Sequence, residues 1–413
     1  MKNSLKKRER IAIANQQIQQ DILQKRRVHR FIKWSLLALF IGIAVGTSSS
    51  FFLYALEWVT TTRIHNAWLL YALPIGGLLT GLIYFYFGKE AAKGNVLLLE
   101  AITDPEKKIP FYMAPLVFIG TLISHLFGAS AGREGTALQM SATIAEQIAR
   151  PFNIPASHRK IVIRTAIAAG FGSVFGTPFA GIVFAFEILC KRDFSLFSLW
   201  SVSLATFVAH TTTHFIGPDH TTYVIENLPK FSINTIFLTL VIGIIFGVCA
   251  WLFVHSMETS KSLFNKIKYP PIRPLLGGIA LVVLMSLLET RAYEGLGIDQ
   301  IVRSFQTPAF PTAFLLKLGL TVLTISAGFK GGEVTPLFFI GATLGSTLSL
   351  LLPIPTAFLA GMGFVAVFAG ATKTPLACSM MAMELFGIPY GIYALPICLI
   401  AVFVAGKKSI YTV

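Results

Sequence analysis

Long apolar stretches, separated by short polar segments, constrain this chain more than any other feature. Windows of mostly apolar residues lie at 34–56, 68–87, 112–127, 161–188, 194–216, 234–256, 275–288, 313–328, 336–352 and 356–404. A helix that spans a bilayer needs about 20 such residues. Since 54% of the 413 residues are apolar and only 13% are charged, the sequence predicts an all-α, multi-pass membrane protein.

The net charge of +15 is gathered beside the apolar windows rather than spread over a face that nucleic acid would contact. Basic residues crowd the segments 1–33, 191–192, 261–273 and 407–408. By the positive-inside rule these segments are cytoplasmic, and so are both termini. The segment IANQQIQQDILQ within the basic arm is either an amphipathic helix on anionic lipid or a solvated spacer. No nucleic-acid partner is predicted.

Neither the cysteines nor the histidines indicate a metal centre. Cys190, Cys249, Cys378 and Cys398 lie in or beside apolar windows without CxxC spacing, which is typical of small core residues. His210 and His214 have the i, i+4 spacing of metal ligands, and His220 follows, but no carboxylates cluster around them. We therefore predict no metal site and no cofactor.

Two pairs of motifs repeat along the chain at nearly one period. TPFAGIVFAFE at 177–187 and TPLACSMMAME at 374–384 share Thr, Pro, two Ala and Glu at identical spacing, 197 residues apart. GREGT at 132–136 and GGEVT at 331–335 are 199 residues apart. The agreement predicts a cytoplasmic arm at 1–33, a first transmembrane repeat at 34–225 and a second at 232–413.

The two repeats are expected to have opposite orientations in the membrane. The loop Gly217–Ile233 carries Asp219 and Glu226 against Lys230 and lies between windows flanked by basic clusters, so we place it outside. The first repeat then enters from the cytoplasm and the second from outside. Inverted repeats are typical of secondary transporters, in which broken helices meet at a midplane substrate site.

The stretch GASAGREGTALQM places an arginine and a glutamate among small residues inside an apolar region. Charged residues within a bilayer are costly and usually functional. A helix beginning near Glu134 would direct unpaired backbone N–H groups toward the midplane, where they favour an anion. GGEVTPLFFIGATLG, with Pro336 near its start, supplies a second helix end. The alternative is that each motif is only a tight glycine turn.

These motifs resemble those of the CLC family of chloride channels and proton-coupled anion antiporters. GREGT resembles its Gly-Arg-Glu-Gly-Pro motif, GGEVTP its Gly-x-Phe-x-Pro motif, and GKEAAKGNVLLLE stands where its first anion-binding stretch lies. GKKSIYTV ends in a tyrosine at the position that closes the family's site. The resemblance extends over nearly the whole chain after residue 34.

The resemblance implies a role for each matching residue. Glu134 is expected to be the gating glutamate, which carries protons and competes with the anion. Backbone N–H groups of Gly135, Glu333 and Val334 are expected to bind the anion, together with the side chains of Asn95 and Tyr411. The resemblance also implies a homodimer with one pathway in each subunit.

Departures from the chloride-transporting pattern resemble the bacterial fluoride/proton antiporter branch. Asn95 replaces serine, Thr136 replaces proline, Ile188 occupies a proton-relay position, and Thr335 adds a hydroxyl. An amide and a hydroxyl offer hydrogen bonds to an ion that has lost its water. We predict a fluoride/proton antiporter that exports fluoride across the bacterial inner membrane. The alternative is a chloride channel or a chloride/proton exchanger.

Other residues have more than one interpretation. Glu187 is a candidate for the proton path, but Glu187 and its counterpart Glu384 also suit a structural role in accepting backbone N–H groups. Arg133 either attracts anions or forms a structural ion pair. An intramembrane enzyme is not expected, because no GxSxG, HExxH or GxxxxGK[ST] motif is present.

Overall fold

The computed structural model describes residues 2–104, 106–188, 194–225, 228–229 and 233–411. Within these residues the chain forms helices throughout and no β-strand beyond one isolated bridge. The prediction of an all-α protein is therefore confirmed for the described part. The interpretations of Cys190, Lys191, Arg192, Glu226 and Lys230 fall outside the described residues.

The helices of the two halves correspond in order, although some pairs differ in length, such as α1 with 64 residues and α9 with 33. The pairs are α1 (Lys2–His65) with α9 (Ile233–Asn265), α2 (Leu73–Phe87) with α10 (Ile272–Leu287), α3 (Asn95–Thr103) with α11 (Ile298–Gln306), α4 (Met113–Leu126) with α12 (Ala313–Ala327), α5 (Glu134–Ala149) with α13 (Val334–Leu348), α6 (Arg159–Phe175) with α14 (Thr356–Thr372), α7 (Pro178–Glu187) with α15 (Pro375–Phe386), and α8 (Leu196–Ile216) with α16 (Gly391–Val404). Short 3₁₀ helices, η1 (Ala67–Ala72), η2 (Ala91–Lys93), η3 (Arg150–Phe152), η4 (Ala156–His158) and η5 (Ile388–Tyr390), lie between them.

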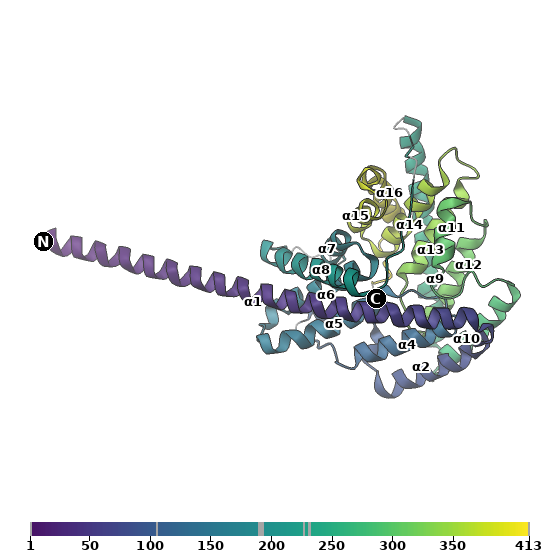
Figure 1. Cartoon of the computed structure of the whole chain (residues 1–413), viewed down its shortest axis with the longest axis horizontal. Coiled ribbons are helices and arrows are strands. Elements are labelled where there is room, and N and C mark those ends of the chain that lie inside the picture. Colours follow the sequence, from purple (N-terminus) through teal and green to yellow (C-terminus); the bar gives the residue numbers. More distant parts are fainter. Residues whose placement is uncertain (1, 105, 189–193, 226–227, 230–232, 412–413) are drawn as a thin grey trace.

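The first helix differs from what the apolar windows predicted. α1 continues without a break from the basic arm through the first apolar window, so its backbone shows no boundary at residue 34. Figure 1 shows its N-terminal part projecting away from the other helices. We call the face of the molecule where α1 ends, at His65, the distal face, because it is remote from the basic arm.

Two long apolar windows are in fact broken helices. The window 161–188 divides into α6 and α7, and the break falls at Gly176, which has a left-handed φ of 74°. The window 356–404 divides first at Lys373, the corresponding residue, with a φ of 66°. In each case a Thr-Pro pair follows, and proline at a first helical position is well suited to begin a new helix. Short α3 and α11 were not among the predicted windows.

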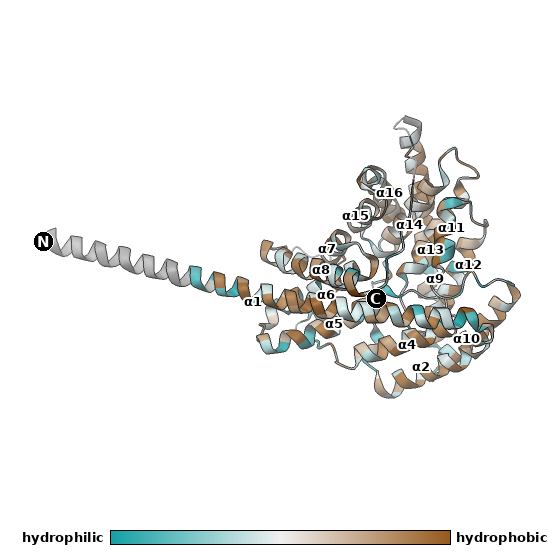
Figure 2. Cartoon of the chain, viewed as in Figure 1, coloured by the Kyte–Doolittle hydropathy of each residue, from teal (hydrophilic) through white to brown (hydrophobic). Residues whose placement is uncertain are grey.

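The surface of the molecule is largely apolar, whereas the central helices are buried on all sides. Nearly every residue of α14 is buried, and most of α6 and α13 is as well. Large apolar side chains are exposed on the peripheral helices, and Figure 2 shows that apolar residues predominate along the helices. Arg27–His65, Ala67–Phe87 and Phe237–Asn265 are long and apolar enough to cross a membrane by length and composition, and further apolar helices of 10–17 residues accompany them.

The closest helix contact in the centre joins α13 and α14 through glycines. A Cβ atom added at Gly341 would lie 2.0 Å from the carbonyl oxygen of Gly363, and one added at Gly345 would lie 2.0 Å from that of Leu359. Small residues let helix backbones approach closely in membranes, where packing rather than water exclusion holds helices together. This contact fixes the orientation of α13, whose N-terminus contributes to the site described below.

We expect Gly341→Ala to destabilise the protein, because the added methyl group must displace the α14 backbone. Overpacking of this kind costs about 1–3 kcal/mol. Gly319→Ala is a matched control, since nothing lies within 4 Å of a Cβ atom at Gly319 on α12. Thermal unfolding in detergent should show a lower midpoint for Gly341→Ala only. Equal midpoints for the two variants would contradict this account of the packing.

Candidate anion site

The GREGT and GGEVT motifs meet in the middle of the fold. The Gly132 N–H donates to the Gly332 carbonyl at 2.6 Å, and the Gly332 N–H donates to the Gly132 carbonyl at 2.8 Å. A Cβ atom on Gly332 would lie 2.7 Å from the backbone nitrogen of Gly135, so a side chain has no room there. The glycines therefore allow the two turns to pair directly, backbone against backbone.

A helix begins immediately after each turn, as the sequence predicted. α5 begins at Glu134 after Arg133, and α13 begins at Val334 after Glu333. Neither preceding residue caps its helix with a side-chain hydrogen bond, so no cap of this kind covers the first N–H groups. Two positively polarised helix ends thus lie beside the same glycine bridge.

The Glu134 carboxylate lies at the beginning of α13. Its Oε2 atom accepts hydrogen bonds from the backbone N–H groups of Thr335 and Arg133, both at 3.1 Å. Its Oε1 atom accepts a hydrogen bond from the Thr335 hydroxyl and lies 3.6 Å from the Nε atom of Arg133. Glu134 is 1% exposed. The side chain of Glu134 therefore already engages donors at the start of α13.

Asn95 lies beside the first motif, at the start of α3. Its Oδ1 atom accepts a hydrogen bond of 3.1 Å from the Nε2 atom of Gln139 on α5, and its Nδ2 atom would lie 3.1 Å from a Cβ atom at Gly135. The amide N–H₂ group is thus directed toward the helix end that follows Glu134. Sequence reasoning missed Gln139, whose polar side chain on a buried helical face was the available signal.

Tyr411 is buried against the core rather than frayed. It is 8% exposed, its ring packs edge to face on Phe184 with centroids 6.4 Å apart, and its backbone N–H donates to Ser409. Among the described residues its hydroxyl has no hydrogen-bond partner. Phe184 in turn contacts Phe368, which packs against Phe338 of α13. The hydroxyl is therefore available to water or to a ligand.

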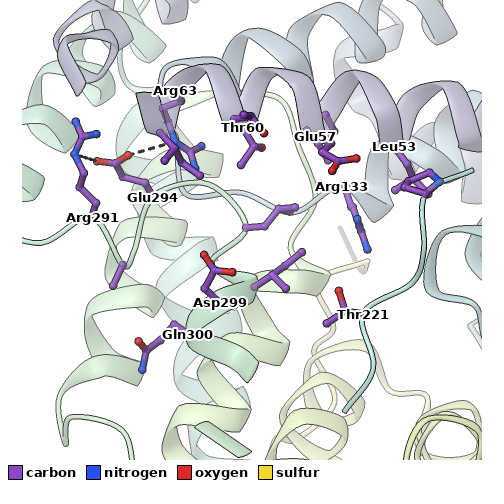
Figure 3. Close-up of a pocket in the computed structure, with 18 of the residues that line it drawn as sticks. Leu53, Glu57, Thr60, Arg63, Arg133, Thr221, Arg291, Glu294, Asp299 and Gln300 are labelled. Atoms are coloured by element: carbon purple, nitrogen blue, oxygen red, sulfur yellow. Dashed lines mark ion pairs between the residues drawn. The ribbon is translucent and has the colours of Figure 1, made fainter. Parts of the chain in front are cut away.

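A cavity of about 830 Å³ opens on the distal face, next to Arg133. It is lined by the last turns of α1, by residues 218–221 and by residues 290–303. Figure 3 shows Arg133, Glu57 and Asp299 around it. Glu134 itself does not line the cavity, although it follows Arg133. Its carboxylate contacts both Arg133, which lines the cavity, and the N–H group of Thr335 at the start of α13.

Glu187 and Glu384 each cap a helix of the other repeat. The two oxygens of Glu187 accept hydrogen bonds from the N–H groups of Leu376 and Ala377 at 2.9 and 2.7 Å. Those of Glu384 accept from Phe179 and Ala180 at the same two distances. The carboxylates thus stabilise the starts of α15 and α7 reciprocally. Ile188 ends α7 and presents no titratable group.

The histidines do not form a recognisable metal site. The rings of His210 and His220 are stacked with centroids 6.4 Å apart, and those of His210 and His214 have the same separation. Among the described residues, no group of three or more His, Cys, Asp and Glu side chains is placed to hold a metal ion.

Comparison with known proteins agrees with the geometry. The all-helical fold with its apolar outer surface is that of a multi-pass membrane transport protein. A family model described as "Voltage gated chloride channel" matches residues 76–406, and the chain belongs to this family. It is 41% identical, over 92% of its length and 85% of the other's, to a "Chloride/fluoride channel protein" of Pseudomonas syringae pv. tomato.

Solved structures have the same fold. A CLC-type fluoride/proton antiporter superposes with a TM-score of 0.88 at 37% identity, covering 92% of this chain and 96% of the other. A slow cyanobacterial Cl⁻/H⁺ antiporter superposes with a TM-score of 0.80 at 20% identity, over the same shares of the two chains, which supports the fold alone. The resemblance predicted from the motifs is confirmed.

The reciprocal caps lead to a prediction about Glu187. We expect Glu187→Gln to lower thermal stability and to leave proton coupling intact, because the change weakens hydrogen bonds to a charged acceptor, each worth about 1.5–3 kcal/mol. Glu384→Gln is the matched control and should have the same effect. A loss of proton transport in Glu187→Gln alone, measured by pH change in liposomes, would instead place Glu187 on the proton path.

Proposed function

We propose that this protein exchanges fluoride for protons and exports fluoride from the cytoplasm. One observation carries the proposal: the Glu134 carboxylate accepts the Thr335 N–H and hydroxyl at the start of α13. These are donors that a bound anion would need. An acid that occupies an anion's place is able to couple the anion to a proton, because two negative charges in one buried site repel each other strongly.

The exchange cycle follows from this competition. When the anion approaches, the Glu134 carboxylate takes up a proton and loses its preference for the N–H groups at the helix end. The protonated side chain then moves away and the anion takes its place beside Gly135, Glu333 and Val334. Release of the anion and of the proton returns Glu134 to the position seen here. The distal cavity beside Arg133 provides a route to the outside.

Fluoride is the substrate we favour. The hydroxyls of Thr335 and Tyr411 and the amide of Asn95 would supply hydrogen bonds in place of the water that fluoride loses. The relatives named for fluoride also support this choice, since they match over most of the chain. Chloride remains the alternative, and chloride flux without protons would indicate a passive channel.

The setting of the protein completes the proposal. We place it in the bacterial inner membrane with both termini in the cytoplasm, so that the distal face lies outside. Family resemblance leads us to propose a homodimer with one pathway in each subunit and lipid around its apolar surface. Transport needs no cofactor and no covalent chemistry, and we propose that the protein is not an enzyme.

Glu134→Gln should abolish coupled exchange. In wild-type liposomes a fluoride gradient is expected to drive protons against their own gradient. The neutral amide is unable to carry a proton, so the variant should move no protons. Fluoride-selective and pH electrodes used together measure both fluxes. Fluoride flux without proton movement in the wild type would contradict antiport and favour the channel.

Selectivity should depend on Asn95 and Thr335. The double variant Asn95→Ser with Thr335→Ala removes both added hydrogen-bonding groups. Loss of hydrogen bonds to an anion, each worth about 1.5 kcal/mol or more, should lower fluoride transport relative to chloride by roughly tenfold. Thr335→Ser keeps the hydroxyl and serves as the control. An unchanged ratio in the double variant would remove these residues from the selectivity determinants.

Substitutions of Tyr411 test whether its hydroxyl binds the anion. Tyr411→Phe keeps the ring packing on Phe184 but loses one donor, so fluoride affinity should weaken by roughly tenfold while the protein stays folded. Tyr411→Ala should in addition uncouple transport in part, since the ring is lost. Isothermal titration with fluoride measures the affinity. Wild-type affinity in both variants would show that the anion is bound by other groups.

A further inference from the structure

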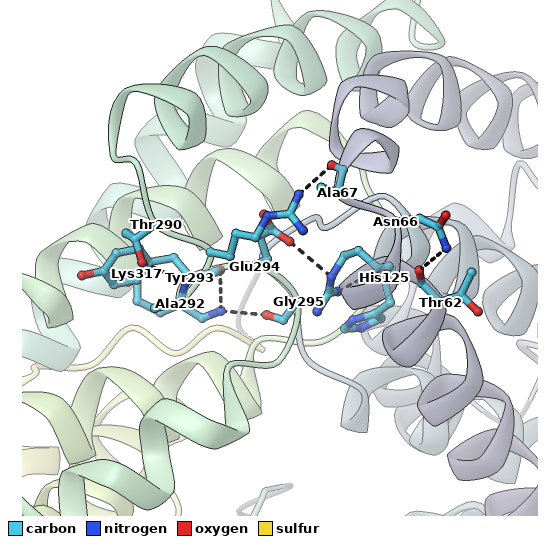
Figure 4. Close-up of polar contacts among 12 residues, drawn as sticks. Thr62, Asn66, Ala67, His125, Thr290, Ala292, Tyr293, Glu294, Gly295 and Lys317 are labelled. Atoms are coloured by element: carbon cyan, nitrogen blue, oxygen red, sulfur yellow. Dashed lines mark hydrogen bonds and ion pairs between the residues drawn. The ribbon is translucent and has the colours of Figure 1, made fainter.

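A second group of charged side chains lies on the distal face, away from Glu134. Arg63 near the end of α1 is 6% exposed, Lys317 within α12 is 0% exposed, and Glu294 is 5% exposed. They surround the segment 289–297 between α10 and α11, which we call the distal loop. Figure 4 shows Lys317 and Glu294 at the loop, and Figure 3 shows Arg63 beside Glu294.

Arg63 joins the distal loop to the first repeat. Its Nε atom lies 3.3 Å from Oε2 of Glu294, and its Nη1 atom donates to the His125 carbonyl at 2.8 Å. A Cβ atom at Gly295 would lie 2.5 Å from Nη1 of Arg63, so the guanidinium rests directly on the loop backbone. On the other side of Glu294, Arg291 lies 3.6 Å away and donates to the Ala67 carbonyl.

Lys317 on α12 donates hydrogen bonds to the backbone of the same loop. Its Nζ atom donates to the carbonyls of Tyr293 and Gly295 at 3.0 and 2.7 Å, and it lies 5.1 Å from the centre of the Phe339 ring. No carboxylate accepts a hydrogen bond from it among the described residues. A lysine in the middle of an apolar helix was a visible signal that sequence reasoning passed over.

The cluster contains more basic than acidic groups. Among the described residues, the basic side chains of Arg63, Arg291 and Lys317 lie around the loop, and Glu294 is the carboxylate that pairs with both arginines. Burial raises the pKa of the Glu294 carboxyl, and the nearby Arg63, Arg291 and Lys317 charges oppose that shift. Buried charges rarely stabilise a fold better than apolar residues of the same size. An arrangement of this kind is therefore expected to fix a conformation that function requires.

The distal loop connects directly to the transport machinery. Leu296 packs in one cluster with Phe52 and Leu56 of α1 and Met140 of α5. A Cβ atom at Gly297 would lie 2.7 Å from the ring of Phe339 on α13. The loop thus touches both helices that begin at the glycine bridge, and several of its residues line the cavity that Arg133 also lines.

We propose that Lys317 and Arg63 are positioning residues for exchange: they hold the distal loop as a fixed wall of the anion exit, so that Glu134 alone controls passage. This inference rests on the proposed fluoride/proton exchange. If the distal loop is no longer held in place, fluoride is able to leave without waiting for Glu134 to move. Fluoride transport then continues, but its coupling to proton movement is lost.

Lys317→Met tests the proposal, because methionine keeps the length of the side chain and removes the charge. We expect fluoride efflux to persist in liposomes while proton uptake per fluoride falls. Gly295→Ala perturbs the contact with Arg63 without removing a charge and should have the same effect, so it carries the test if Lys317→Met does not fold. Gly319→Ala, two positions from Lys317 with open space around it, should behave like the wild type.

Paired substitution distinguishes charge from packing. Arg63→Gln leaves Glu294 buried with one cation fewer, whereas Arg63→Gln with Glu294→Gln removes both members of the ion pair. Coupling should be restored in part by the second change if the pairing matters. No recovery in the double variant, or wild-type coupling in Lys317→Met and Gly295→Ala, would overturn the assignment.

Hydrogen exchange separates this inference from the proposed function. Amides of residues 289–297 should exchange faster in Lys317→Met than in the wild type, whatever ion is transported. Unchanged exchange in this segment would show that Lys317 does not hold the loop. A wild-type protein that moves no protons with fluoride would refute the proposed function itself. Even then, faster hydrogen exchange in Lys317→Met would support the inference that Lys317 holds the loop in place.

Discussion

The pairing of Gly132 with Gly332 is the contact on which the rest of the structure depends. Two backbone hydrogen bonds join the turns of the two repeats, and only residues without side chains allow the backbones so close. Because each turn leads directly into a helix, the pairing places the starts of α5 and α13 beside one another. The N–H groups at the two helix ends, some of which the Glu134 carboxylate accepts, then lie close together in one buried site that favours a negative charge.

A second set of contacts crosses between the repeats with the same symmetry. Glu187 caps α15 and Glu384 caps α7. A carboxylate from each half of the chain therefore accepts N–H groups at a helix start in the other half. Both oxygens of each carboxylate accept hydrogen bonds from backbone N–H groups, which stabilises the starts of α15 and α7. Glu134 differs, because its carboxylate accepts a hydrogen bond from the start of the other motif's helix, α13. There it would compete with an anion for the same N–H donor.

The sequence predicted those parts of the molecule that local chemistry determines. Glycine runs marked the paired turns, and the common spacing of the motifs predicted a repeat. The Thr-Pro pairs were noted only as a repeated motif, and the helix breaks before them were not predicted. Asn95 was placed near Gly135 by resemblance, and the structure brings them together. The extent of α1 was not predicted, because a polar, basic segment gives no apolar pattern from which to recognise a continuous helix.

Contacts between distant segments were beyond the reach of the sequence. Nothing in the spacing of Arg63, Glu294 and Lys317 shows that they converge, since they come from α1, the distal loop and α12. Gln139 was missed for the same reason, because its partner Asn95 lies 44 positions earlier. Such pairings depend on how the helices pack against one another. A single sequence does not show which distant residues that packing brings together.

The central claim is that Glu134 and the anion compete for one set of donors, and proton uptake on binding tests it most directly. Fluoride is titrated into purified protein in weakly buffered detergent solution while the pH is recorded. The account predicts that wild-type protein takes up protons as fluoride binds, and that Glu134→Gln binds fluoride without taking up any. Fluoride binding by the wild type with no proton uptake would contradict the account.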